Sequence, residues 1–464
     1  MIYPLLNWLA DNLAAIMFLV MFVVIFCGYP VAFVLGGTGL IFALVGWGLD
    51  VMPLRGLNSV ILRMWGGVAA DPVLVSIPMF IFMGTILERS GAAKDMLDAT
   101  QVLLRRVPGG LAVTVMVIGT ILAAPIGVVG ASVVLLSLIA LPRMLDQGYD
   151  KHLAIGTIAS AGTLGILIPP SIMLVVMGEM LNTSVGSLFA AAMLPGFMLS
   201  GLYLLYILYV AFRYPERAPP LPPDVGPQTR REFWLEMWRG LFPMTFLMVV
   251  VLGAIFAGFA TATESAGVGV AGAMVIAWIN GTLNLNMLRE AIREGARANA
   301  LVFLLFFGAT CFSYVFRAIG GDDLMFTVLN YLGITTKWEI LFFVMALIFF
   351  LGFPFEWIEI CLIVLPIFIP VLAKLDFGDF IGDKAWFMPW FATLVAVNLQ
   401  TAFMTPPFGA TLFYMKGTAP SWITMSDVYK GMTPFVILQL IGLMICIAFP
   451  ELSLWLPRVA GFLD

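Results

Sequence analysis

Long apolar stretches alternate with short polar ones along almost the whole chain. A helix needs about 20 mainly apolar residues to cross the hydrocarbon core of a bilayer. The pattern therefore predicts an all-α, multi-pass membrane protein embedded in the lipid bilayer. Single apolar runs predict spanning helices at 12–28, 31–48, 72–87, 185–212, 241–259, 266–283, 300–316 and 431–454.

Two further apolar runs contain a Pro-Pro pair. The run 152–181 includes GILIPPSI from Gly165, and the run 386–415 includes MTPPFGAT from Met404. Proline removes an amide donor and clashes with the preceding turn, so each run is expected to be a broken helix. Unwound backbone at membrane depth is tolerated inside the protein or along a cavity, where carbonyls can bind ions. A purely structural kink is the alternative for either pair alone.

Two other apolar runs, 109–145 and 338–374, are too long for one span. The first is interrupted between Pro125 and Ser132, and the second at the sequence GFPFE, 352–356. Each run predicts a re-entrant hairpin whose tip is the interruption. Positive charges flank both ends of the first run, which therefore enters and leaves on one side of the membrane: Arg105, Arg106, Arg143 and Lys151. A single long, tilted helix is the alternative.

The second half of the chain repeats the first. A shift of 224 positions places Gly84 on Gly308, and SLIALP ending at Pro142 on CLIVLP ending at Pro366. We expect two repeats, 1–212 and 241–464, joined by a polar cytoplasmic linker at 213–240. Each repeat has five spans, a hairpin and an amphipathic surface helix, the latter at 50–71 and 284–299. Because five is odd, the two repeats are expected to have inverted orientations.

Three polar segments, 88–108, 320–337 and 374–384, are predicted to be loops. The last two contain acidic residues and are placed outside the cell. The positive-inside rule makes the opposite, arginine-rich side cytoplasmic. Its basic residues are Arg105, Arg106, Arg143, Lys151, Arg213, Arg217, Arg230, Arg231, Arg239, Arg289, Arg293 and Arg297.

Composition excludes several other functions. The chain is 62% hydrophobic and 11% charged, and its net charge of −4 gives no support for a nucleic-acid partner. One histidine, His152, and the absence of CxxC and HExxH spacings argue against a protein metal site. Without a clustered acid, base or nucleophile, an enzyme is not expected. The cysteines fall in apolar runs and are predicted to be buried free thiols: Cys27, Cys311, Cys361 and Cys446.

Each hairpin tip and the neighbouring helix break offer the carbonyl and hydroxyl oxygens that hard cations prefer. The first predicted cation site comprises Val129, Ser132, Gly165, Ile168 and Pro170. The second comprises Gly352, Ala402, Thr405 and Phe408. Helix amino ends beside the tips and breaks would face an anion. Candidates for substrate binding or coupling are Gly130, Ala131, Ser171, Glu356, Glu359, Pro406, Pro407 and Gly409.

Four glutamates lie in or beside apolar runs. Glu356 and Glu359 stand where a carboxylate is costly, so they are expected to bind a cation or carry a proton. Pairing with a neighbouring helix, or reaching the interface, is the alternative for both. Glu264, in the string TATES, is interpreted as a helix cap, and Glu179 as an interfacial residue.

Several short strings together resemble one transporter family. They are IPMFIFMG from Ile77, GAS at Gly130, GILIPPS at Gly165, TATES at Thr261 and MTPPFG at Met404. Over nearly its whole length the chain resembles the large membrane subunit, of the DctM type, of a tripartite ATP-independent periplasmic (TRAP) transporter.

The resemblance implies an elevator mechanism in the bacterial inner membrane, driven by sodium, with Na⁺ at the two tip-and-break pairs and no other cofactor. It also implies two partners, a small four-helix membrane subunit and a soluble periplasmic substrate-binding protein. The chain departs from the family at Gly130-Ala131-Ser132, where members often have Gly-Ser-Ser, so one hydroxyl is missing. The string EWIEI from Glu356 resembles a branch associated with 2-oxo acids and related organic acids.

The predicted function is therefore sodium-coupled uptake of a small organic acid delivered by a binding protein. A stand-alone anion symporter, driven by sodium or protons and needing no binding protein, is the main alternative. A channel is less well supported, because a channel does not need two hairpins entering from opposite faces.

Overall fold

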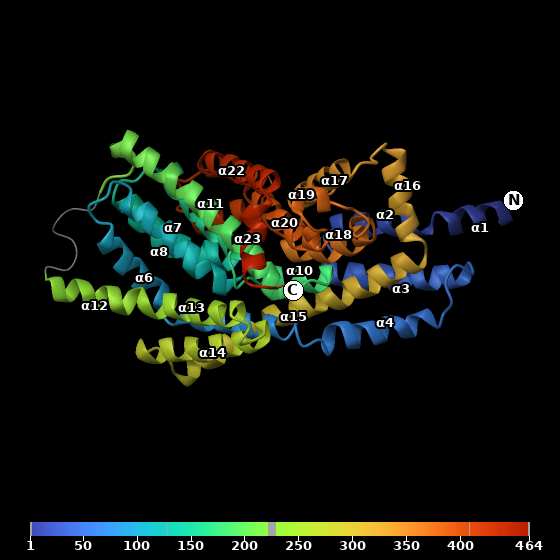
Figure 1. Ribbon diagram of the computed structural model, residues 1–464, viewed down its shortest axis with the longest axis horizontal. Coiled ribbons are helices and arrows are strands. Elements are labelled where there is room, and N and C mark those ends of the chain that lie inside the picture. Colours follow the sequence, from blue (N-terminus) through green and yellow to red (C-terminus); the bar gives the residue numbers. More distant parts are fainter. Residues whose placement is uncertain (1, 128, 221–228, 408, 463–464) are drawn as a thin grey trace.

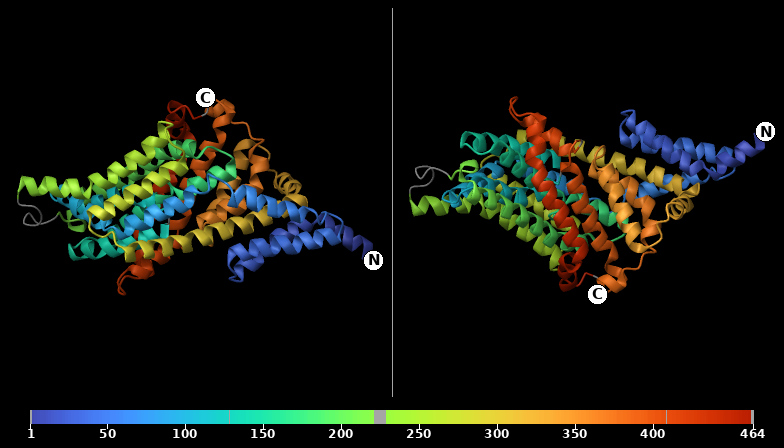
Figure 2. Two further views of the ribbon diagram at one scale, coloured as in Figure 1. Left: turned by 90° about the horizontal axis from the view of Figure 1, so that it is seen from below. Right: turned by 90° about the horizontal axis from the view of Figure 1, so that it is seen from above.

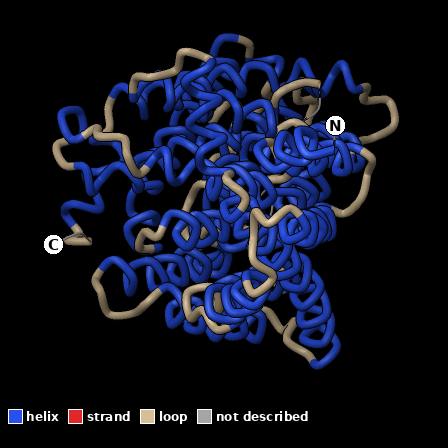
Figure 3. The backbone as a smooth tube through the Cα atoms, turned by 90° about the vertical axis from the view of Figure 1, so that its right-hand side faces the viewer, coloured by secondary structure: helices blue, strands red, loops and turns tan. Residues whose placement is uncertain are grey.

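The computed structural model describes residues 2–127, 129–220, 229–407 and 409–462. These residues form helices joined by short loops, with no strand among them (Figure 3). In the first half the helices are α1 (Ile2–Asp11), α2 (Leu13–Phe26), α3 (Val31–Gly48), α4 (Gly56–Met64), η1 (Trp65–Ala69), α5 (Ser76–Arg89), α6 (Ala92–Leu103), α7 (Gly110–Ile126), α8 (Val129–Asp146), α9 (Lys151–Thr163), η2 (Leu164–Ile166), α10 (Ile172–Leu181), α11 (Val185–Arg213) and η3 (Pro215–Arg217).

The second half continues in a similar order. Its helices are α12 (Arg230–Gly240), α13 (Phe242–Phe256), α14 (Ala262–Ile279), α15 (Leu285–Ala318), α16 (Gly321–Tyr331), α17 (Lys337–Leu351), α18 (Trp357–Leu372), α19 (Gly378–Ile381), η4 (Lys384–Trp386), α20 (Phe387–Met404), α21 (Ala410–Thr418), α22 (Met425–Ala448) and α23 (Glu451–Val459). The two aligned prolines, Pro142 and Pro366, lie inside α8 and α18.

Seven helices in the described part of the chain are long and apolar enough to cross a bilayer. They are Val31–Gly48, Val129–Asp146, Val185–Arg213, Ala262–Ile279, Leu285–Ala318, Lys384–Met404 and Met425–Ala448, and the bent pair of α12 and α13 provides an eighth. Lipid cannot form hydrogen bonds with backbone N–H and C=O groups, and a helix pairs these groups internally. This architecture therefore suits a multi-pass membrane protein.

Segments predicted to be polar loops contain helices. Residues 88–108 include α6, and 320–337 include α16. Ala93, Met96 and Leu97 of α6 are buried at helical spacing, although its average composition is polar. Amphipathic packing against neighbouring helices therefore outweighs the polar composition on which the prediction rested. The linker 213–240 and the loop 374–384 likewise contain helices, α12 and the four-residue α19.

The two predicted surface helices differ from each other. The segment 50–71 folds into α4 followed by the π-helical turn η1, and the chain then breaks before α5. The segment 284–299 forms no separate helix, because α15 continues through it for 34 residues, beside α3 and α5 (Figures 1 and 2). Gly66, Gly67 and Pro72 interrupt the first segment, whereas the corresponding part of α15 has no such cluster of helix breakers.

Two predictions about single residues have opposite outcomes. Glu264 is the N3 residue of a capping box with Thr261 at the start of α14, so its interpretation as a helix cap is confirmed. The burial predicted for all four thiols is wrong for Cys27, which is exposed directly after the end of α2. The other three cysteines are buried.

Candidate functional site

The first helix break lies entirely inside the protein. After Thr163 the chain makes the 3-10 turn η2, bends through Pro169 and Pro170, and resumes as α10 after the extended residue Ser171. The Ser171 hydroxyl donates to the carbonyl of Ile166 at 2.5 Å. Every residue proposed for this break is buried: Gly165, Ile168, Pro170 and Ser171.

The first tip packs against this break. Between α7 and α8 the chain turns at Gly127, with φ +64°. A Cβ on Gly127 would lie 2.6 Å from Cδ1 of Ile172, so the tip contacts the first residue of α10. The Ser132 hydroxyl, on a residue only 1% exposed, has no hydrogen-bond partner among the residues that the structure describes. Val129 is buried, and Gly130 and Ala131 are half-buried.

The second break is more open than the first. It lies between Met404 and Ala410, where Thr405 and Pro406 are half-buried and Pro407 is exposed. The Thr405 hydroxyl donates to the carbonyl of Thr401 at 2.7 Å, and the Gly409 amide, on a buried residue, donates to the carbonyl of Thr405. The predicted ligand Phe408 lies outside the described residues.

The second tip also meets its break. A Cβ on Gly352 would lie 2.3 Å from Cβ of Ala402, and both residues are buried. Glu356 is exposed and is the N-cap residue of α18, and its amide donates to Glu359 Oε2 at 3.2 Å. The two glutamates form a reciprocal capping box, so the half-buried Glu359 has a structural partner.

Tyr414 connects the two tips and was not among the predicted residues. Its hydroxyl donates to Glu356 Oε1 at 2.8 Å. Its ring faces Gly130, because a Cβ there would lie 2.9 Å from Cζ of the tyrosine. Tyr414 is the only tyrosine in the run 386–415 and follows the break by one helical turn, which is the signal that could have identified it.

A buried polar cluster joins the two broken helices. Gln400 of α20 donates to the Thr163 hydroxyl of α9 at 3.2 Å, and Gln439 of α22 contacts the sulfur of Met404 at 3.3 Å. The amide oxygens of Gln400 and Gln439 are buried without a hydrogen-bond partner within the described ranges. Polar residues scattered over three helices leave no local pattern, so the sequence did not reveal this cluster.

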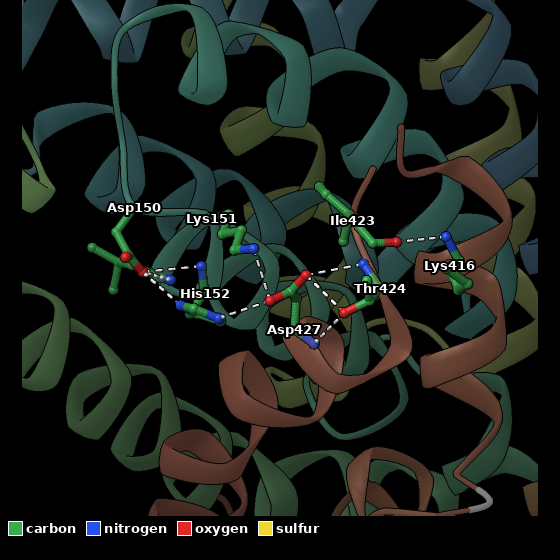
Figure 4. Close-up of polar contacts among 8 residues, drawn as sticks. Asp150, Lys151, His152, Lys416, Ile423, Thr424 and Asp427 are labelled. Atoms are coloured by element: carbon green, nitrogen blue, oxygen red, sulfur yellow. Dashed lines mark hydrogen bonds and ion pairs between the residues drawn. The ribbon is translucent and has the colours of Figure 1, made fainter. Parts of the chain in front are cut away.

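A second polar network ties the start of α9 to the start of α22 (Figure 4). Asp150 accepts bonds from the amides of His152 and Leu153, both at 3.0 Å. Lys151 Nζ lies 2.8 Å from Asp427 Oδ1, and His152 Nε2 lies 3.2 Å from the same oxygen. A helix of the first half is therefore held to one of the second half at a single carboxylate.

A family profile matches residues 18–452 and is described as the DctM component of the tripartite ATP-independent periplasmic transporter. The chain belongs to this family. It is accordingly a transporter permease rather than an enzyme, and a multi-pass protein of the bacterial inner membrane.

Curated relatives share this assignment. The chain is 28% identical over 389 residues to the C4-dicarboxylate TRAP transporter large permease protein DctM of Pseudomonas aeruginosa, covering 84% of this chain and 87% of that one. It is 28% identical over 456 residues to the ectoine/5-hydroxyectoine TRAP transporter large permease protein UehC of Ruegeria pomeroyi, covering 97% and 99%.

A solved structure shares the fold. The crystal structure of the YdaH transporter of Alcanivorax borkumensis superposes with a TM-score of 0.60, covering 88% of this chain and 90% of that one. The sequences are 17% identical, so this likeness concerns the fold alone.

Proposed function

We propose that this TRAP permease is a symporter that couples the entry of Na⁺ to the uptake of a small organic acid. The observation that carries the proposal is Ser132, whose hydroxyl is buried at the first tip without a partner in the described part of the chain. A buried polar atom without a hydrogen bond costs about 1–3 kcal/mol, which a bound cation would offset. Hydroxyl and carbonyl oxygens are suitable ligands for a hard cation such as Na⁺.

The second tip-and-break pair supports a second sodium site. Gly352 and Ala402 are in contact, and the Thr405 hydroxyl stands at the break. Backbone carbonyls freed by the unwinding supply further oxygens. Val129, Gly165, Ile168 and Pro170 would provide them at the first site, and Gly352, Ala402 and Phe408 at the second.

The transport step is proposed to be an elevator movement. The hairpins α7–α8 and α17–α18 and the broken helices α9–α10 and α20–α21 form the moving unit. The scaffold is formed by α3, α5, α13, α14 and α15, in which α15 packs on α3 and α5, and α14 packs on α5 and α13. Inverted repeats such as 1–212 and 241–464 suit alternating access to a site near the bilayer midplane.

The proposed substrate is a carboxylate. Relatives are named as permeases for C4-dicarboxylates and for sialic acid. Amino ends of α8, α10, α18 and α21 next to the tips and breaks carry positive partial charge and favour an anion. A 2-oxo acid is the narrower proposal, and it rests on the sequence EWIEI alone.

The tripartite name implies two partners, which are also proposed here: a small four-helix membrane subunit and a periplasmic substrate-binding protein. Uptake in proteoliposomes that contain this chain and the small subunit tests the proposal. A binding protein loaded with a labelled 2-oxo acid is added outside, with and without an inward sodium gradient.

Uptake is expected only when the sodium gradient and the loaded binding protein are both present. Equal uptake of free substrate without the binding protein would favour the stand-alone symporter. Uptake driven equally well by a proton gradient, without sodium, would contradict the sodium coupling.

A further inference from the structure

We propose that the Tyr414 hydroxyl binds the carboxylate of the substrate, and that Glu356 occupies this donor when no substrate is bound. This inference rests on the proposed transport of an organic acid. It adds a specific recognition group on α21 and assigns Glu356 the role of an internal competitor.

The hydroxyl stands where the two hairpin tips meet. It donates to Glu356 Oε1 at 2.8 Å, at the start of α18 in the second hairpin. The tyrosine ring faces Gly130, at the start of α8 in the first hairpin. Glu356 is exposed and Tyr414 is half-buried, so the described residues do not enclose the bond between them.

The chemistry of this bond matches the proposed substrate. A phenol donating to a carboxylate makes a charge-assisted hydrogen bond, stronger than one between neutral groups. A substrate carboxylate offers the same acceptor as Glu356, so the donor exchanges one carboxylate for another. Such an exchange gives weak, reversible binding, which a transporter needs in order to release its substrate.

Lys416, the basic residue nearest to Tyr414 in the sequence, is already engaged and is not proposed to bind the substrate carboxylate. Its Nζ donates to the carbonyl of Ile423 at 2.5 Å. The Glu356 carboxylate repels a second anion while it occupies the phenol. Once a substrate takes the phenol, Glu356 loses this donor and keeps its capping-box partner Glu359, while its side chain remains at the surface.

Gly130 leaves room for the ring of Tyr414 beside the first tip. A Cβ at this position would lie 2.9 to 3.2 Å from three carbon atoms of the tyrosine ring. A larger residue would therefore push the phenol away from the second tip. This close approach gives a reason for a glycine at the first tip beyond the conformational freedom of its backbone.

Two substitutions test the roles of the Tyr414 hydroxyl and the Glu356 carboxylate separately. Tyr414→Phe keeps the ring against Gly130 and removes the hydroxyl, so the Kd for the substrate is expected to rise about ten-fold, the typical effect of a lost charge-assisted bond. Glu356→Gln removes the competing charge and keeps the side-chain shape, so the Kd is expected to fall about three-fold, since a carboxylate acceptor bonds more strongly than an amide. In the double variant the benefit of Glu356→Gln should disappear, because the donor is missing.

The measurement is equilibrium binding to the complex of permease and small subunit at saturating sodium. Its probe is the carboxylate that the wild-type complex binds most tightly, chosen from labelled 2-oxo acids and C4-dicarboxylates. Tyr331→Phe is the matched control, because Tyr331 lies on α16 and is 91% exposed. An unchanged Kd in Tyr414→Phe, or a Glu356→Gln variant that binds more weakly than wild type, would overturn the inference.

The same preparation distinguishes this inference from the proposed function. If wild type binds a carboxylate but sodium does not drive its uptake, sodium coupling fails while the binding constants still decide the role of Tyr414. If the wild-type complex binds no carboxylate from either class, both proposals fail together.

Discussion

The two tip-and-break pairs share one arrangement but differ in burial. At the first pair Ser132 and Ser171 are enclosed, with exposures of 1% and 0%. At the second pair Thr405 is half-buried, and Glu356 and Pro407 are exposed. The first pair is therefore enclosed by the protein, whereas the second is partly uncovered. We therefore expect cation binding at the first pair to depend on the oxygens of the protein. At the second pair we expect that water can replace a lost protein ligand.

The largest effect is expected where the second tip touches its break. Gly352→Ala places a methyl group where Cβ would lie 2.3 Å from Cβ of Ala402. Overpacking of this kind costs about 1–3 kcal/mol of unfolding free energy, and the separation of tip from break should abolish most sodium-driven uptake. Uptake and thermal unfolding are measured in parallel. Gly253→Ala on α13 is the control, because a Cβ there meets no atom of the described residues within 4 Å. Equal uptake by the two variants would refute the importance of the contact between Gly352 and Ala402.

The next effect tests the closed pair. Ser132→Ala removes a buried hydroxyl that has no partner in the described ranges. If this oxygen binds Na⁺, the sodium concentration for half-maximal uptake should rise about ten-fold, as is typical when a metal site loses a supporting group. If it does not, sodium dependence stays unchanged and the protein gains about 1–3 kcal/mol of stability, because an unpaired polar atom has been removed.

A smaller change is expected at the open pair. Thr405→Val removes the hydroxyl that bonds Thr401 while keeping the branched shape. Because water can reach this half-buried position and replace a ligand, half-maximal sodium should rise by only about three-fold. Thr405→Ser should restore the wild-type value. A change as large as that of Ser132→Ala would remove the distinction between the two pairs.

The smallest functional effect is expected outside both pairs. Thr261→Ala breaks the capping box that Thr261 forms with Glu264 at the start of α14. Loss of an N-cap costs about 1 kcal/mol of helix stability, so the unfolding temperature should fall slightly. Uptake per folded molecule should equal that of wild type. A changed sodium dependence would show that the start of α14 influences the proposed sodium sites.

Local chemistry made much of the fold predictable. Each Pro-Pro pair removes two adjacent amide donors, unlike the single prolines inside α8 and α18, and Gly127 adopts a left-handed conformation, so the interruptions follow from the residues themselves. The sequence does not predict the helices α6 and α16, because their buried residues alternate with polar ones in segments of polar composition.

The contacts between distant segments were not predictable. Tyr414 meets Gly130 across more than 280 positions of the chain, and Gln400 meets Thr163 across 237. A pattern within one helix carries no information about such a partner. The sequence therefore identified the broken segments but not the side chains that join them.

The uninterrupted helix α15 has a consequence for the membrane around the protein. Its 34 residues make a rod about 51 Å long, well beyond the hydrocarbon thickness of about 30 Å. Arg89, at the end of α5, lies 2.5 and 2.6 Å from Glu290 and Glu294 and anchors the polar start of this rod. The apolar part of α15, residues 300–316, is about 26 Å long and fits that thickness, so the polar first half extends beyond the hydrocarbon core. This single helix therefore carries the scaffold from the membrane interior into the headgroup region.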